Sequence, residues 1–303
     1  MSKKSQLYSV RSLRWNEVFN IFKKTVIEFT NEKSLFHGAA LSYYTILSLV
    51  PILYLSIVSF GQFIGQKTMV AIISNVLHEQ VGIQDVKGIL EFLNEIDFEK
   101  SNWALQIIGI VVLMVSATAM LSSLKNSINE FFDIERVHAT KKKQFLSTLL
   151  DKVMHLSLLM IFGLIIVLTY FAQTIIVSFG DKIFSSFDEL FNVFVFLTQH
   201  AVPFMTNFLI FFFIFMYLHD GIIARKLAVY GSIFTTTLLY LGQLLIKFYL
   251  LHYFFAKDAG IAGTILILLT WVYYTSQIIF LGAKFTAVFA KVSGSEIKVK
   301  QQD

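Results

Sequence analysis

Six long apolar runs, separated by polar loops, constrain this chain more than any other feature of its sequence. A helix needs about 20 mostly apolar residues to cross roughly 30 Å of hydrocarbon. The runs lie at Ala39 to Phe60, Trp103 to Leu124, His155 to Phe179, Ala201 to Leu218, Leu227 to Leu250 and Gly263 to Phe289. Only 15% of the residues are charged and 56% are hydrophobic, whereas about a quarter are charged in soluble domains. The sequence therefore predicts an all-α, polytopic membrane protein built on a bundle of six transmembrane helices.

The distribution of Lys and Arg predicts how these spans are oriented. Cytoplasmic loops carry more Lys and Arg than external loops do. Seven such residues precede the first span, and the five successive loops hold three, six, one, two and one before a tail with three. This alternation predicts that both the N-terminus and the C-terminus lie in the cytoplasm.

The same assignment divides the chain into segments. Residues 1–38 form a basic N-terminal segment with apolar residues at three- and four-residue spacing, which is typical of an amphipathic helix. Such a helix either lies in the headgroup plane or packs on the inner ends of the spans. Residues 39–290 form the membrane domain, in which the outer loop 61–102 is expected to hold amphipathic helices, and residues 291–303 form a cytoplasmic tail.

Composition also limits the kinds of chemistry that the chain can perform. The chain has no cysteine, which excludes disulfides, thiolate metal sites and cysteine nucleophiles, and its seven histidines are scattered without metal-ligand spacing. The net charge of +5 comes from residues spread along the loops rather than from a basic domain. We therefore expect no cofactor, no metal site, no nucleic-acid partner and no enzymatic activity.

Polar side chains inside the spans are the candidate functional residues, because a Lys at the centre of a membrane helix costs about 2.5–3.5 kcal/mol on insertion scales. Many fall at similar depth near the cytoplasmic side, and we expect them to line a vestibule. This inner polar layer comprises Ser42, Tyr43, Tyr44, Thr45, Ser122, Lys125, Asn126, Asp220, Arg225 and Lys284. Lys284 lies close enough to the inner end of its span that its ammonium could also snorkel to the interface.

Two further groups of polar residues lie deeper. Thr270, Tyr274 and Gln277 share a face of the last span with Lys284, so that face should point into the bundle, either lining a path or making interhelical hydrogen bonds. Toward the outside, Gln173, Gln243 and Lys247 form a thinner outer polar layer.

Two stretches resemble the YihY/virulence factor BrkB family of bacterial inner-membrane proteins. The first is Ala39-Ala40-Leu41-Ser42-Tyr43-Tyr44-Thr45 through Pro51, and the second runs from Gly260-Ile261-Ala262-Gly263 through Trp271-Val272-Tyr273-Tyr274 to Leu281-Gly282-Ala283-Lys284. The order and spacing of the spans agree with the family as well. One departure is that the family's Gly-Ala-Glu near the end of the last span reads Gly-Ala-Lys here, so Lys284 reverses the charge of that position.

The resemblance implies a six-span protein of the bacterial cytoplasmic membrane, whose relatives are proposed to be transporters or envelope factors, and some of which were once labelled ribonuclease BN. Polar faces inside a small bundle, with a basic cytoplasmic side, favour a transporter or lipid-handling protein for an anionic solute or headgroup. A non-catalytic scaffold for envelope assembly is the alternative. A ribonuclease is the least favoured, because it needs clustered carboxylates or a paired acid and base in a wet site. Membrane lipids and a small anionic solute are the expected partners.

Overall fold

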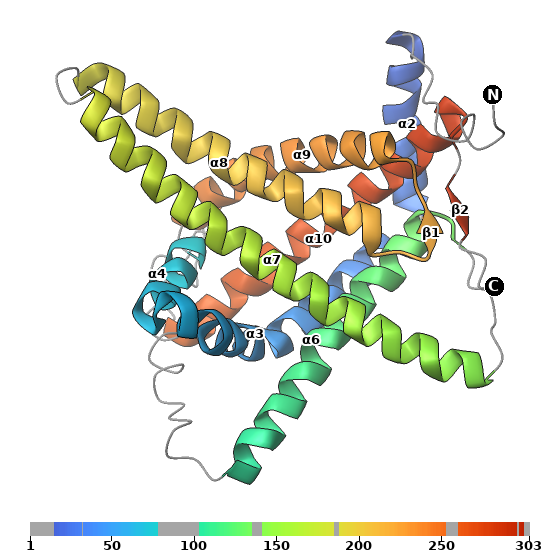
Figure 1. Cartoon of the computed structure of the whole chain (residues 1–303). Helices are drawn as coiled ribbons and strands as arrows, with labels where there is room; N and C mark the ends of the chain where they lie inside the picture. Colours follow the sequence, from blue (N-terminus) through green and yellow to red (C-terminus); the bar gives the residue numbers. More distant parts are fainter. Residues whose placement is uncertain are drawn as a thin grey trace, which may run out of the picture.

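A computed structural model describes residues 15–31, 33–77, 103–134, 141–184, 188–252, 260–295 and 297–299. These residues are almost entirely helical (Figure 1). The helices are α2 (Trp15–Asn31), α3 (Ser34–Ile64), α4 (Gln66–Val76), α6 (Trp103–Phe131), α7 (Lys141–Phe184), α8 (Asp188–Tyr217), α9 (Arg225–His252) and α10 (Gly260–Ser293). Two short strands, β1 (Gly221–Ile222) and β2 (Lys298–Val299), pair in antiparallel fashion.

Four of the described helices are long and apolar enough to cross a membrane. These candidate spans are Lys152–Ile183, Glu189–Tyr217, Arg225–Ile246 and Ile265–Ser293, in α7, α8, α9 and α10. Large apolar side chains on their outer faces are exposed, as at Leu164, Leu168 and Leu245, which suits a helix whose solvent is lipid. The expected all-α membrane protein is confirmed to this extent. The first two expected spans coincide with α3 and α6, and their crossing of the membrane stays a prediction.

One helix is longer than the sequence indicated. We expected the fourth span to begin at Ala201, but α8 begins at Asp188 and contains Pro203 in its interior. Polar residues end an apolar run without ending a helix, because the helix is held by backbone hydrogen bonds. One of them has a partner on the next helix, since His200 Nδ1 lies 2.9 Å from the Tyr240 hydroxyl of α9. Buried polar groups between membrane helices are commonly satisfied in this way.

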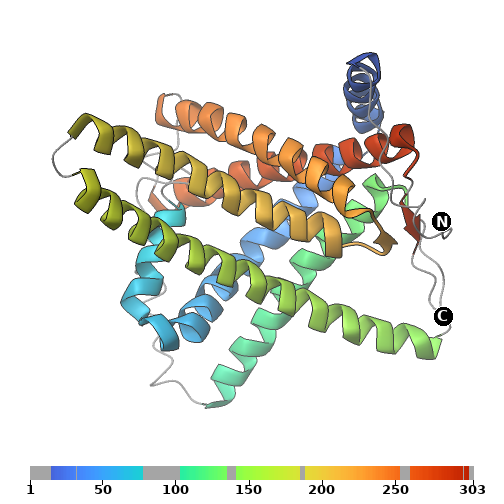
Figure 2. The ribbon, with the colours of Figure 1, turned by 45° about the horizontal axis from the view of Figure 1, so that its top comes forward.

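The helices form a closed ring. α3 packs against α6 and α10, α10 against α9, α9 against α8, and α8 against α7, while α6 and α7 also touch. Figures 1 and 2 show this order from two directions. At one end of the ring, helices α6, α8 and α10 terminate and α9 begins. We call this the charged end. Lys125, Asp133, Asp220 and Lys284 all contribute to ion pairs there.

The packing of α9 on α10 depends on small residues. A Cβ atom at Gly282 would overlap the Thr235 hydroxyl, and one at Gly231 would overlap the Thr286 hydroxyl. The glycine of each helix thus receives a threonine of the other, which lets the two backbones approach closely. Both threonine hydroxyls donate to carbonyls of their own helices.

The structure also describes parts of the flanking segments. α2 packs on α10, with Ile21 only 1% exposed beside Phe285 and Val288. Of the outer loop 61–102, α4 is an amphipathic helix that buries Met69, Ile72 and Ile73, and residues 78–102 lie outside the described residues. The expected boundary of the tail at residue 291 falls inside α10, which continues to Ser293.

Candidate binding site at the charged end

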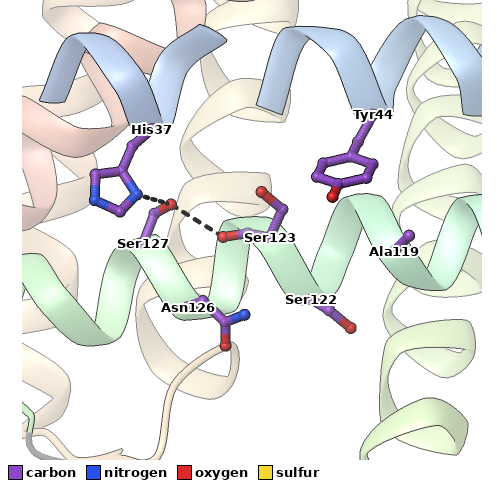
Figure 3. Close-up of a pocket in the computed structure, with 7 residues that line it drawn as sticks. All are labelled: His37, Tyr44, Ala119, Ser122, Ser123, Asn126 and Ser127. Carbon is purple, nitrogen blue, oxygen red and sulfur yellow. Dashed lines mark hydrogen bonds between the residues drawn. The ribbon is translucent and has the colours of Figure 1, made fainter. Parts of the chain in front are cut away.

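A pocket of about 390 Å³ lies between α3 and α6 near the charged end. Figure 3 shows the His37 and Tyr44 side chains of α3 directed toward α6. The α6 side of the pocket is one helix face of small and hydroxyl-bearing residues at three- and four-residue spacing. Its members are Ala119, Ser122, Ser123, Asn126 and Ser127. The pocket therefore presents hydroxyls, an amide and an imidazole, with no carboxylate among its lining residues.

His37 connects the pocket to the end of α6. Its Nδ1 lies 2.9 Å from the Ser127 hydroxyl oxygen, and its Nε2 lies 3.1 Å from a carboxylate oxygen of Glu130. The Ser127 hydroxyl donates to the Ser123 carbonyl, so its oxygen accepts from His37. A protonated His37 would donate at both ring nitrogens, with Ser127 and Glu130 as the acceptors.

A second histidine lies behind the pocket. The Ser122 hydroxyl is 3.3 Å from Nδ1 of His155 on α7, and His155 is only 2% exposed. This contact joins the wall of the pocket to the next helix of the ring. Two of the scattered histidines of the sequence therefore contact α6, one from α3 and one from α7.

Next to the pocket, the buried Lys125 forms an ion pair with Asp220, whose side chain is 46% exposed. The two charged atoms are 2.7 Å apart, and Lys125 is 5% exposed. Asn129 donates its side-chain amide to the second carboxylate oxygen of Asp220 at 2.8 Å and accepts the Asp220 backbone N–H at 2.9 Å. Burial raises the pKa of Asp220, but the hydrogen bonds from Lys125 and Asn129 and the charge of Lys125 outweigh it, so the pKa lies below its ordinary value.

Lys284 belongs to a separate cluster at the same end. Its ammonium, on a side chain only 2% exposed, lies 3.2 Å from Asp133 and 3.6 Å from Glu28 of α2. Lys291 contacts the other Asp133 oxygen at 2.7 Å. Burial raises the pKa of Asp133, but the hydrogen bond from Lys291 and the charges of both lysines outweigh it, so the pKa lies below its ordinary value. These contacts join two lysines to two carboxylates.

The position of the Asp133 carboxylate follows from the backbone conformation after the end of α6, which is unusual for an aspartate. Asp133 has φ 56°, the Asp133 N–H bonds to the Glu130 carbonyl at 3.0 Å, and the Ile134 N–H bonds to the Asn129 carbonyl at 2.8 Å. This is a Schellman motif, in which the left-handed position is usually glycine. The carboxylate in place of glycine faces two lysines, which offsets the cost of the left-handed conformation.

The structure separates the expected inner polar layer into these groups. Tyr44, Ser122 and Asn126 line the pocket, Lys125 pairs with Asp220, and Lys284 belongs to the other cluster. The remaining members of the expected layer bond within their own helix or are exposed. The hydroxyls of Ser42 and Thr45 donate to carbonyls of their own helix, Tyr43 is 60% exposed, and Arg225 is exposed at the start of α9.

The deeper polar residues do not share one surface. Thr270 is exposed and donates to the Leu266 carbonyl, Tyr274 has its hydroxyl against Gly242 of α9, and the Gln277 amide donates to the Ser34 carbonyl of α3 at 3.1 Å. Of the two expected roles, lining a path or bonding between helices, Gln277 has the second, because it makes an interhelical hydrogen bond. In the outer layer, Gln173 on α7 and Gln243 on α9 are half-buried, and α8 packs against both helices. The Lys247 side chain lies outside what the structure describes.

Several residues of the charged end were not singled out from the sequence, namely Glu28, His37, Asn129, Glu130, Asp133 and His155. The available signal was the polar face that α6 continues beyond its apolar part, with Asn126, Asn129, Glu130 and Asp133 at helical spacing. Among the described residues, no group of three or more His, Asp or Glu side chains is arranged to hold a metal ion.

Long apolar helices with exposed apolar surfaces define a helical membrane protein. The chain belongs to the virulence factor BrkB family, which matches residues 25–303. A similar protein is a UPF0761 membrane protein of Glaesserella parasuis serovar 5 (strain SH0165), with 28% identity over 186 residues, which cover 60% of this chain and 61% of the relative. The chain thus matches less than two thirds of the length of that relative. No solved structure matches the chain.

Proposed function

We propose that this protein is a transporter or lipid-handling protein of the bacterial cytoplasmic membrane that binds an anionic solute or lipid headgroup in the pocket between α3 and α6. The observation that carries the proposal is the lining of that pocket. Hydroxyl- and amide-bearing side chains of α6 line it together with Tyr44 and the imidazole of His37.

These donors suit the oxygens of an anion. A phosphate or carboxylate group is an acceptor, and the hydroxyls of Ser123 and Tyr44 can donate to it, whereas the Ser127 hydroxyl donates to the Ser123 carbonyl. A carboxylate, that of Glu130, lies beside His37 Nε2, and a protonated His37 would offset its negative charge. The pocket is open rather than enclosed, which allows a headgroup to enter while its acyl chains stay in the bilayer.

The orientation of the bundle is part of the proposal. The charged end carries the basic loops, so the positive-inside rule places it on the cytoplasmic side together with both termini. The pocket then opens at the depth of the cytoplasmic leaflet, where anionic headgroups are abundant. The proposal assigns no catalysis to the site, because Asp133 and Asp220 are each engaged by a lysine.

Native mass spectrometry of the purified protein with phosphatidylglycerol tests binding at the pocket. Ser123→Leu should fill the pocket and reduce the fraction of protein that retains the lipid by severalfold. Ser157→Leu is the matched control, because Ser157 is an exposed hydroxyl of α7 bonded only within its helix. Equal retention by the two variants and the unsubstituted protein would contradict the assignment of the pocket.

An envelope-assembly scaffold is the second candidate, and the close packing of α9 on α10 favours it. The reciprocal contacts of Gly282 with Thr235 and of Gly231 with Thr286 leave little room for these helices to move. A scaffold needs rigidity, whereas a transporter needs alternative arrangements of its helices. Measurements of flux through the membrane distinguish the two.

A further inference from the structure

Three different sides of α2 can be distinguished by their surroundings. One side packs on α10 through Ile21 and Thr25, both 1% exposed. A second side carries Phe19, Phe22 and Val26 at three- and four-residue spacing, and all three are exposed, by 70%, 44% and 54%. The remaining side is mostly polar and includes Asn20 and Lys24. Within the part of the chain that the structure describes, only one of the two apolar sides is therefore covered.

The direction of the uncovered apolar side follows from Phe22. Its ring lies 5.6 Å from the rings of both Phe234 and Phe285. Phe234 lies within the candidate span Arg225–Ile246, and Phe285 within Ile265–Ser293. Phe22 therefore lies level with the membrane-spanning parts of α9 and α10, and Phe19 and Val26 share its side of the helix.

The orientation of α2 relative to α9 and α10 also suits a helix that lies in the membrane plane. Figure 1 shows α2 crossing α9 and α10 at a steep angle, and Figure 2 shows the same helix nearly end-on. The packing of Ile21 on Phe285 and Val288 and the Glu28–Lys284 contact hold α2 to α10. Its orientation is thus set by the bundle.

The charges on α2 favour an anionic surface. Lys23 follows directly after Phe22 on the helix, Lys24 is its neighbour, and Lys33 lies in the turn before α3, and all three are exposed. Long basic side chains beside an apolar stripe extend to the headgroups while their alkyl parts stay in the apolar layer. Each basic residue near an anionic membrane surface adds attraction to it.

We propose that α2 is an interfacial anchor: its Phe19–Phe22–Val26 side inserts at the boundary of headgroups and acyl chains of an anionic leaflet, and the adjacent Lys23 contacts the headgroups. The ligand class is the anionic lipid surface rather than a single bound lipid. The geometry that carries this inference is independent of the α3–α6 pocket.

Single-cysteine labelling tests the anchor, because the natural chain contains no cysteine. Phe19→Cys and Val26→Cys are spin-labelled in the full-length protein, reconstituted in vesicles that contain phosphatidylglycerol. Asn20→Cys and Lys24→Cys, on the polar side of the same helix, are the matched controls. The ratio of collision with oxygen to collision with a water-soluble nickel chelate reports whether each label lies in lipid or water. We expect this ratio to be severalfold higher at positions 19 and 26 than at 20 and 24.

Three results would overturn the proposal. Equal, water-like ratios at all four positions would show that no side of α2 inserts. Low accessibility to both reagents at 19 and 26 would show that protein, such as a second copy of this chain, covers the stripe. An unchanged ratio at position 26 in purely zwitterionic vesicles, or after Lys23→Gln with Lys33→Gln, would contradict the assignment to an anionic surface.

Discussion

The ammonium of Lys284 lies 3.2 Å from a carboxylate oxygen of Asp133, the residue that ends α6 in a left-handed conformation. The lysine side chain is 2% exposed and the aspartate side chain 45% exposed. The contact joins the last span to the end of α6, and Glu28 adds α2 to the same cluster. Three segments far apart in the sequence thus depend on one buried cation.

Asp133→Asn should destabilise the protein. Asn tolerates the left-handed conformation, so the substitution removes the charge without straining the backbone. Lys284 then loses one of the two carboxylates that lie within 4 Å of its ammonium, Asp133 and Glu28, and we expect a loss of about 1–3 kcal/mol in the free energy of unfolding in detergent. Asp181→Asn, at an exposed position of α7, should change it by less than about 0.5 kcal/mol. An Asp133→Asn variant as stable as the natural protein would show that the ion pair contributes nothing.

Stability should fall in acid, partly through Asp133 and Asp220. Both groups have a folded-state pKa below the ordinary value. Their contribution is therefore fully present above the unfolded-state pKa of about 3.9 and is lost as the pH falls through the lower folded-state pKa. Unfolding is measured between neutral pH and about pH 3. The stability difference between the natural protein and Asp133→Asn should shrink below about pH 4, and a constant difference would contradict the assigned shift.

Gly282→Ala should destabilise the packing of α9 on α10. The new methyl group would overlap the hydroxyl of Thr235, a β-branched residue with little rotamer freedom, and overpacking of this kind costs about 1–3 kcal/mol. Thr235→Ala should restore part of the loss when combined with it. The test compares the thermal unfolding of both single variants and the double variant. Strictly additive effects would show that the two residues do not conflict.

The sequence was sufficient for the class of fold and for most helix positions. The apolar runs predict where helices lie because length and hydrophobicity alone decide whether a segment can cross a bilayer. They did not predict that α8 begins at Asp188, since polar residues end an apolar run without ending a helix. Nor did they show that Ile21 of α2 packs on α10, which is a contact between distant segments.

The candidate site was only partly predictable for a related reason. Depth along a helix follows from the sequence, so Tyr44, Ser122 and Asn126 were expected at one level, where they do line a pocket. Rotation about the helix axis and the choice of neighbours depend on packing. That is why Lys284 lies with Asp133 and Glu28 rather than with Tyr44, and why Thr270 is exposed while Gln277 reaches α3.

The most direct test of the proposed function is transport in proteoliposomes. Movement of labelled anionic lipid between leaflets, and flux of small organic anions under sodium and proton gradients, are measured for the natural protein, Ser123→Leu, Tyr44→Phe and the control Ser157→Leu. We predict activity in the natural protein and the control, a severalfold loss in Ser123→Leu and a smaller loss in Tyr44→Phe. Absence of any flux or lipid movement in the natural protein would contradict the account and favour the scaffold.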